Sequence, residues 1–113
     1  MEHYFNSTYD GDLDHLIANS QAKLVEFFTE MDKLKKNIIE VKAQCSYIKS
    51  EIDSLDENDL KLGDLKKSLD SCTGELAQLQ QRNEAVKADI LAEHNVFAAL
   101  TAQRMHIDLI HKS

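Results

Sequence analysis

The sequence is poor in the residues that interrupt helices. Its 113 residues include no Pro, no Trp and only three Gly. Pro inside a helix removes a backbone hydrogen bond and clashes with the preceding turn, and Gly costs about 1 kcal/mol relative to Ala. Leu, Ala, Lys, Glu, Asp and Gln fill most of the chain, a composition that favours long helices over sheets. The sequence therefore predicts one small all-α domain.

Long apolar runs and an excess of positive charge are also missing. No stretch reaches the span of about 20 apolar residues that crosses a membrane, so no direct membrane insertion is expected. Residues 1–9 lack the basic and apolar segments of a signal peptide, which favours a cytoplasmic location. With 20 acidic and 13 basic side chains the chain would be repelled by phosphate, so no nucleic-acid partner is expected.

Motifs that carry chemistry are lacking as well. None of the five His residues lies four residues from another, and neither a His-Glu-x-x-His nor a Cys-x-x-Cys occurs. Asp10, Asp12 and Asp14 resemble the start of a calcium loop, but His15 and Gln21 stand where that loop needs Gly and Glu. We therefore expect a non-enzymatic protein with no metal site, no cofactor and no small-molecule substrate.

What the sequence does contain is a long heptad pattern. Apolar residues recur at alternating spacings of three and four, the a and d positions of a coiled coil. The first seam contains Leu24, Phe28, Met31, Leu34, Ile38, Val41, Cys45, Ile48, Ile52 and Leu55. The second seam contains Leu62, Leu65, Leu69, Cys72, Leu76, Leu79, Asn83, Val86, Ile90, Glu93, Phe97, Leu100, Arg104 and Ile107. The two seams are out of phase.

The phase change coincides with Asp56-Glu57-Asn58-Asp59, a cluster of turn-prone polar residues. A turn at this point gives an antiparallel helical hairpin, whereas a stutter in one continuous rod is the alternative. The turn-prone residues at 56–59 favour the hairpin over the continuous rod. The predicted organisation is then a flexible lead-in at 1–11, a first long helix at 12–55, a turn at 56–59 and a second long helix at 60–111, with a break near 80–87 as an alternative.

Folding the chain at this turn brings apolar positions of the two seams together. The arms match in length, and Glu51 can approach Lys61 while Glu30 can approach Arg82. A parallel homodimer would instead place like charges beside each other. The predicted layers pair Ile52 with Leu65, Ile48 with Leu69, Cys45 with Cys72, Val41 with Leu76, Ile38 with Leu79 and Met31 with Val86.

The apolar stripe widens away from the turn. Apolar residues there occur in adjacent pairs, such as Leu16 with Ile17 and Phe27 with Phe28, which one neighbouring helix cannot cover. We therefore expect this end to pack on further helices, from a homodimer or from a heteromeric helical partner. The expected partner interface contains Leu16, Ile17, Leu24, Phe27, Phe28, Ile39, Leu91, Phe97 and Ile110.

Three polar residues interrupt the second seam: Asn83, Glu93 and Arg104. A polar residue at an a position can fix register and partner number, and the other interpretation is a locally hydrated seam. Both interpretations remain open for Asn83. Cys45 and Cys72 fit as small buried apolar residues, and an intrachain disulfide between them requires that the chain folds back. In a reducing compartment both would be thiols.

Several segments resemble the syntaxin N-terminal three-helix (Habc) domain. Phe27-Phe28 followed by Met31, Leu34, Ile38, Val41, Cys45 and Ile48 looks like the first helix of that domain. Asp64-Leu65-Lys66-Lys67 and Ala88-Asp89-Ile90 with Leu100-Thr101 are similar to segments of its second and third helices. The resemblance implies a regulatory domain in vesicle membrane fusion that packs on a SNARE helix. A helix break between Gln80 and Lys87 would favour that domain, and unbroken helix there would favour the hairpin.

Overall fold

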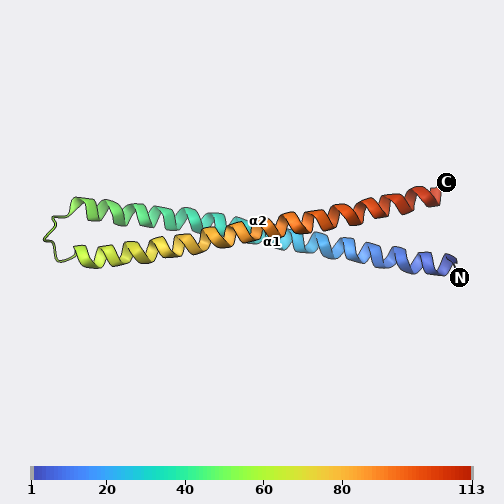
Figure 1. The fold of residues 1–113 in the computed structure, drawn as a ribbon, viewed down its shortest axis with the longest axis horizontal. Coiled ribbons are helices and arrows are strands. Elements are labelled where there is room, and N and C mark those ends of the chain that lie inside the picture. The colour runs from blue at the N-terminus through green and yellow to red at the C-terminus, as the bar shows by residue number, and fades with distance from the viewer. Residues whose placement is uncertain (1, 113) are drawn as a thin grey trace. The chain divides into compact units, whose positions relative to one another are not determined.

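The structure is a computed structural model that describes residues 2–112 and the side chains of residues 11–112. It contains two long helices, α1 (Glu2–Ser54) and α2 (Leu62–Lys112), joined by residues 55–61 (Figure 1). No strand occurs within residues 2–112. The all-α helical hairpin predicted from the heptad pattern is therefore confirmed.

α1 begins at Glu2, ten residues ahead of the predicted start at residue 12. The segment at 1–11, predicted to be a flexible lead-in, is therefore helical from Glu2 onward. The segment contains no Pro, and Gly11 lies within the helix without a positive φ angle. A single Gly in a helix costs about 1 kcal/mol, which is too little to end a long helix. Scattered aromatics and small polar residues therefore did not mark a helix boundary.

The connection between the helices is a hydrogen-bonded turn. The Asp59 N–H donates to the Asp56 carbonyl at 3.0 Å, and the Leu62 N–H donates to the Asp59 carbonyl at 3.2 Å. The Asp59 carboxylate Oδ1 accepts the Lys61 N–H at 2.9 Å, so this side chain satisfies a donor at the start of α2. The chain turns here and does not continue as a rod. α2 then runs through residues 80–87 without a break.

The described residues form two compact units. The turn unit is Glu30–Val86, and it contains the end of α1, the connection and the start of α2. The terminal unit comprises the described residues 2–29 and 87–112, the remaining parts of the two helices. Each unit is an antiparallel pair of helix segments (Figure 1).

The core of the turn unit consists of seam residues. Leu34, Val41, Cys72 and Val86 are buried, and Val86 is 0 % exposed. The other predicted seam residues in this unit are half-buried, as expected for a pair of helices that shields one side of each: Met31, Ile38, Cys45, Ile48, Ile52, Leu55, Leu62, Leu65, Leu69, Leu76, Leu79 and Asn83. Burying a Val or Leu side chain completely stabilises a fold by about 1.5–3 kcal/mol, and half-burial gives correspondingly less.

Charged side chains edge the core of the turn unit. Arg82 Nη2 lies 2.6 Å from Glu30 Oε1, and Arg82 Nε donates to the same oxygen at 2.7 Å, so the expected approach of these two residues occurs. Glu51 has a different contact, because it accepts a hydrogen bond from the hydroxyl of Tyr47 one turn earlier, which raises the pKa of Tyr47. Both contacts are exposed and add little stability.

Candidate interaction surface

The terminal unit continues the heptad seam with a mixture of apolar and polar side chains. Leu13 is 2 % exposed and Ser20 is 3 % exposed. The half-buried seam positions of this unit are Ile17, Leu24, Phe27, Ile90, Glu93, Phe97, Leu100, Arg104 and Ile107. The first seam therefore passes through Ser20 and Phe27.

The placement of Phe27 corrects the predicted first seam, which used Phe28. Phe28 is 52 % exposed, whereas Phe27 is half-buried between the helices. The spacing from Leu24 is three for Phe27, which continues the alternation that Leu13, Ile17 and Ser20 begin. Phe28 therefore lies beside the seam on the outer surface of α1.

Ion pairs accompany the polar seam residues. Lys23 Nζ lies 3.9 Å from Glu93 Oε1, and the Glu93 side chain is 12 % exposed. Arg104 Nη1 lies 3.5 Å from Asp14 Oδ1, and Arg104 Nε lies 3.6 Å from Asp108 Oδ1. The Lys23–Glu93 and Arg104–Asp14 pairs link α1 to α2 at positions where the turn unit uses apolar layers, whereas the Arg104–Asp108 pair lies within α2. At such distances and exposures each contributes at most about 1 kcal/mol.

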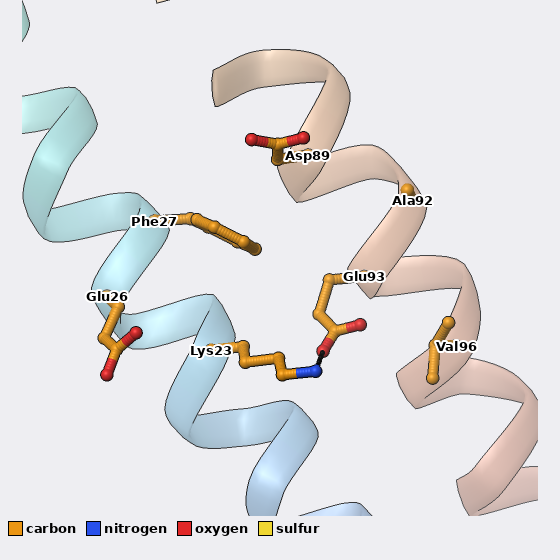
Figure 2. Close-up of a pocket in the computed structure, with 7 residues that line it drawn as sticks. All are labelled: Lys23, Glu26, Phe27, Asp89, Ala92, Glu93 and Val96. Carbon is orange, nitrogen blue, oxygen red and sulfur yellow. Dashed lines mark ion pairs between the residues drawn. The ribbon is translucent and has the colours of Figure 1, made fainter. Parts of the chain in front are cut away.

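A groove of about 420 Å³ opens between the helices beside the Lys23–Glu93 pair. Figure 2 shows Phe27 and Lys23 pointing from α1 toward α2. The other residues that line the groove are Glu26 of α1 and Asp89, Ala92, Glu93 and Val96 of α2. The groove combines an aromatic ring and small aliphatic side chains with carboxylates at its edge.

A second groove of about 520 Å³ shares part of this lining. Leu16 from α1 and Val96 and Leu100 from α2 give it apolar walls, and Ser20 lies at its base. Among the described residues the Ser20 hydroxyl has no hydrogen-bond partner. The two grooves form a surface of the terminal unit with apolar walls and a charged edge.

Large apolar side chains are exposed mainly on the terminal unit. Of the eleven such side chains among the described residues, eight belong to this unit and three to the turn unit. Those of the terminal unit are Leu16, Val25, Phe28, Leu91, Val96, Met105, Leu109 and Ile110. Those of the turn unit are Ile39, Tyr47 and Leu60. We call the first set the terminal apolar surface.

The predicted interface residues fall into two groups. The first group, at least half exposed, consists of Leu16, Phe28, Ile39, Leu91 and Ile110, with Ile39 in the turn unit. The second group, half-buried within the terminal unit, consists of Ile17, Leu24, Phe27 and Phe97. The second group packs between α1 and α2, so the first group is the part that a further helix can cover.

Sequence reasoning left four members of the terminal apolar surface out of the predicted interface: Val25, Val96, Met105 and Leu109. Val25, Val96 and Leu109 each stand next to another apolar residue, and their outward direction follows only from the exact phase of the seam. Met105 stands between Arg104 and His106, so no apolar pair marked it.

The described residues hold no group of three or more His, Cys, Asp or Glu side chains arranged to bind a metal ion. Within the same part of the chain, neither helix has a segment apolar and long enough to span a bilayer. Comparison of the sequence and the structure with protein-family models, curated proteins and solved structures gives no significant match.

Proposed function

We propose that this chain is a non-enzymatic coiled-coil scaffold that assembles with itself or with another helical protein through its terminal unit. One observation carries the proposal: eight of the eleven exposed large apolar side chains of the described residues lie on the terminal apolar surface. An excess of exposed large apolar side chains in one unit is a feature of protein interaction sites.

The shape of the surface supports a helix as the partner. Leu16 of α1 and Val96 of α2 are exposed and line the grooves between the helices, and helices pack by placing ridges of side chains into such grooves. A second copy of the chain would complete a four-helix bundle, and a different helical protein would complete a three-helix or larger bundle. Burial of each large apolar side chain would add about 1 kcal/mol or more of favourable free energy.

We also propose a reducing, cytoplasmic location, in which Cys45 and Cys72 would remain thiols. The alternative function implied by the syntaxin resemblance is a regulatory three-helix domain. No observation favours it, because the described residues form two helices and α2 is unbroken at residues 80–87.

Sedimentation of the purified chain at micromolar concentrations tests self-assembly. We expect an oligomer, and we expect Leu91→Glu to shift it to the monomer because a charge would then lie in the buried contact. Tyr47→Glu is the matched control, since Leu91 is 63 % exposed in the terminal unit and Tyr47 is 66 % exposed in the turn unit. The control variant should remain an oligomer with the helical content of the wild type.

A monomeric wild-type chain would direct the test to a heteromeric partner. A photo-crosslinking side chain placed at Phe28 in cells should then capture a helical protein that the same group at Tyr47 does not capture. If the chain is a monomer and both positions give the same background, the proposal is wrong.

A further inference from the structure

The two cysteines of the chain lie against each other in the core of the turn unit. Cys72 of α2 is buried, and Cys45 of α1 is half-buried. The Cys72 thiol donates a hydrogen bond to the Val41 carbonyl at 3.5 Å. The i to i−4 pattern of an α-helix gives this same carbonyl the backbone N–H of Cys45. The Cys72 sulfur therefore lies beside the turn of α1 from which Cys45 projects.

The environments of the two thiols differ. A hydrogen bond with Cys45, then burial, and then the negative charges of Cys45 and Glu75 raise the pKa of Cys72 from 9.0 to about 11. Cys72 therefore stays protonated at neutral pH. Cys45 is more exposed, so it is the thiol that a small oxidant in solution reaches first.

We propose that Cys45 and Cys72 form a redox-sensitive pair that a peroxide oxidises to an intrachain disulfide, which locks α1 to α2 within the turn unit. The proposal does not depend on the terminal apolar surface. It assigns a covalent modification to residues that otherwise serve only as small members of the seam.

The chemistry balances with hydrogen peroxide as the oxidant. The Cys45 thiolate attacks one peroxide oxygen, the O–O bond breaks, and a sulfenic acid and hydroxide form; the proton lost by the Cys45 thiol converts the hydroxide to water. The Cys72 sulfur then attacks the Cys45 sulfur, its proton leaves with the sulfenic hydroxyl as a second water, and the S–S bond forms. The two thiols lose two electrons, and the peroxide gains them.

The disulfide would close a loop that contains the whole connection between α1 and α2. Closing a loop of this length removes conformations from the unfolded chain, so the oxidised hairpin should resist unfolding. A dithiol reductant reverses the bond by thiol–disulfide exchange. The pair would thus make the stability of the turn unit depend on the redox state of its surroundings.

Treatment of the purified full-length chain with hydrogen peroxide tests the proposal. Mass spectrometry should show the loss of two hydrogens from a monomeric chain and, after proteolysis, one peptide pair joined through Cys45 and Cys72. The midpoint of thermal unfolding should rise by about 10 °C and return to its starting value with dithiothreitol.

Two variants separate a positioned pair from chance oxidation. In Cys72→Ser the peroxide should leave a sulfenic acid on Cys45 that a dimedone reagent traps, with no rise in the unfolding midpoint. The matched control moves the α1 thiol by one position in the double variant Cys45→Ser/Ser46→Cys, because Ser46 is exposed beside the seam. We expect no intrachain bond in that variant.

Two results would overturn the proposal. One is a wild-type chain that forms only bonds between molecules or higher oxides of sulfur. The other is an intrachain bond that forms equally fast when the α1 thiol stands at position 46. If a variant loses its helical content, the mass and the unfolding midpoint of the wild type still decide the outcome.

Discussion

The turn unit and the terminal unit share the same heptad spacing, but they place different side chains on it. The turn unit buries Leu34, Val41, Cys72 and Val86, and its edges carry charged residues such as Glu30 and Arg82. The terminal unit has polar or charged residues at seam positions and large apolar residues outside the seam. Heptad spacing alone therefore shows where two helices meet. The residues beside the seam show whether the two helices alone can bury the apolar side chains.

The residue pattern of the terminal unit agrees with the proposal that this helix pair packs on further helices. Ser20, Glu93 and Arg104 occupy seam positions where the pair would gain most from apolar contacts. Val25 and Leu91, in contrast, are apolar and more than half exposed. Stability in the turn unit should depend on its own core, and stability in the terminal unit should depend on what covers it.

The largest expected effect is on the core of the turn unit. Leu34→Ala removes a side chain that is 8 % exposed and should lower the free energy of unfolding by about 2–3 kcal/mol. Ile39→Ala changes a side chain that is 68 % exposed and should alter it by less than about 0.5 kcal/mol. Urea unfolding followed by circular dichroism measures both. Equal effects would mean that Ile39 is covered in solution, and the contrast between core and surface would fail.

A smaller effect of the opposite sign is expected at the polar residue of the turn unit seam. The Asn83 Oδ1 atom is buried and has no hydrogen-bond partner among the described residues. Asn83→Leu should raise the free energy of unfolding by about 1 kcal/mol, because it replaces an unpaired polar atom with apolar contacts. The same urea titration measures it. A loss of stability would indicate that Asn83 contributes a contact that fixes the register.

The charged edge of the turn unit should contribute still less. Arg82→Gln breaks the Glu30 contact and should cost under about 1 kcal/mol at low salt, with the difference shrinking in high salt. Lys66→Gln, at an exposed position of α2, serves as the control. An Arg82 effect that persists undiminished in high salt would point to packing of the Arg82 stem and not to its charge.

The smallest expected effect is a difference in stability between the wild type and Cys72→Ala at alkaline pH. The pKa of Cys72 is raised from 9.0 to about 11, so the folded state holds the thiol proton more tightly than the unfolded state. The resulting stabilisation is complete below pH 9 and disappears as the pH rises toward 11. In reducing buffer, the wild type should therefore lose more stability over this range than Cys72→Ala does. Parallel losses would place Cys72 in a solvated position.

Much of the fold follows from the sequence, because the seam residues are regularly spaced and the turn residues interrupt them at one place. Asp59 belongs to the polar cluster between the two seams and also caps the second helix, so the residue types predict the turn. The residue types did not predict the start of α1, because aromatic and small polar residues can be helical when no Pro is present. The composition of residues 1–11 predicted a helix start at residue 12, whereas α1 begins at Glu2.

The candidate surface was harder to predict than the core. In an adjacent apolar pair such as Phe27 and Phe28, either residue can occupy the seam, and the choice depends on the phase over several turns. Ser20 continues that phase but is polar, so it did not count as a seam residue. The sequence therefore predicted a wide apolar stripe, but only the structure shows which of its side chains point outward.

The antiparallel course of the helices has a practical consequence for handling the protein. Residues 2 and 112 both belong to the terminal unit, so a fluorescent protein or affinity tag attached near either residue would lie in the unit that carries the proposed contact surface. Glu57 and Asn58 are exposed in the connection, within the other unit. A label inserted there would lie outside the unit proposed to bind a partner.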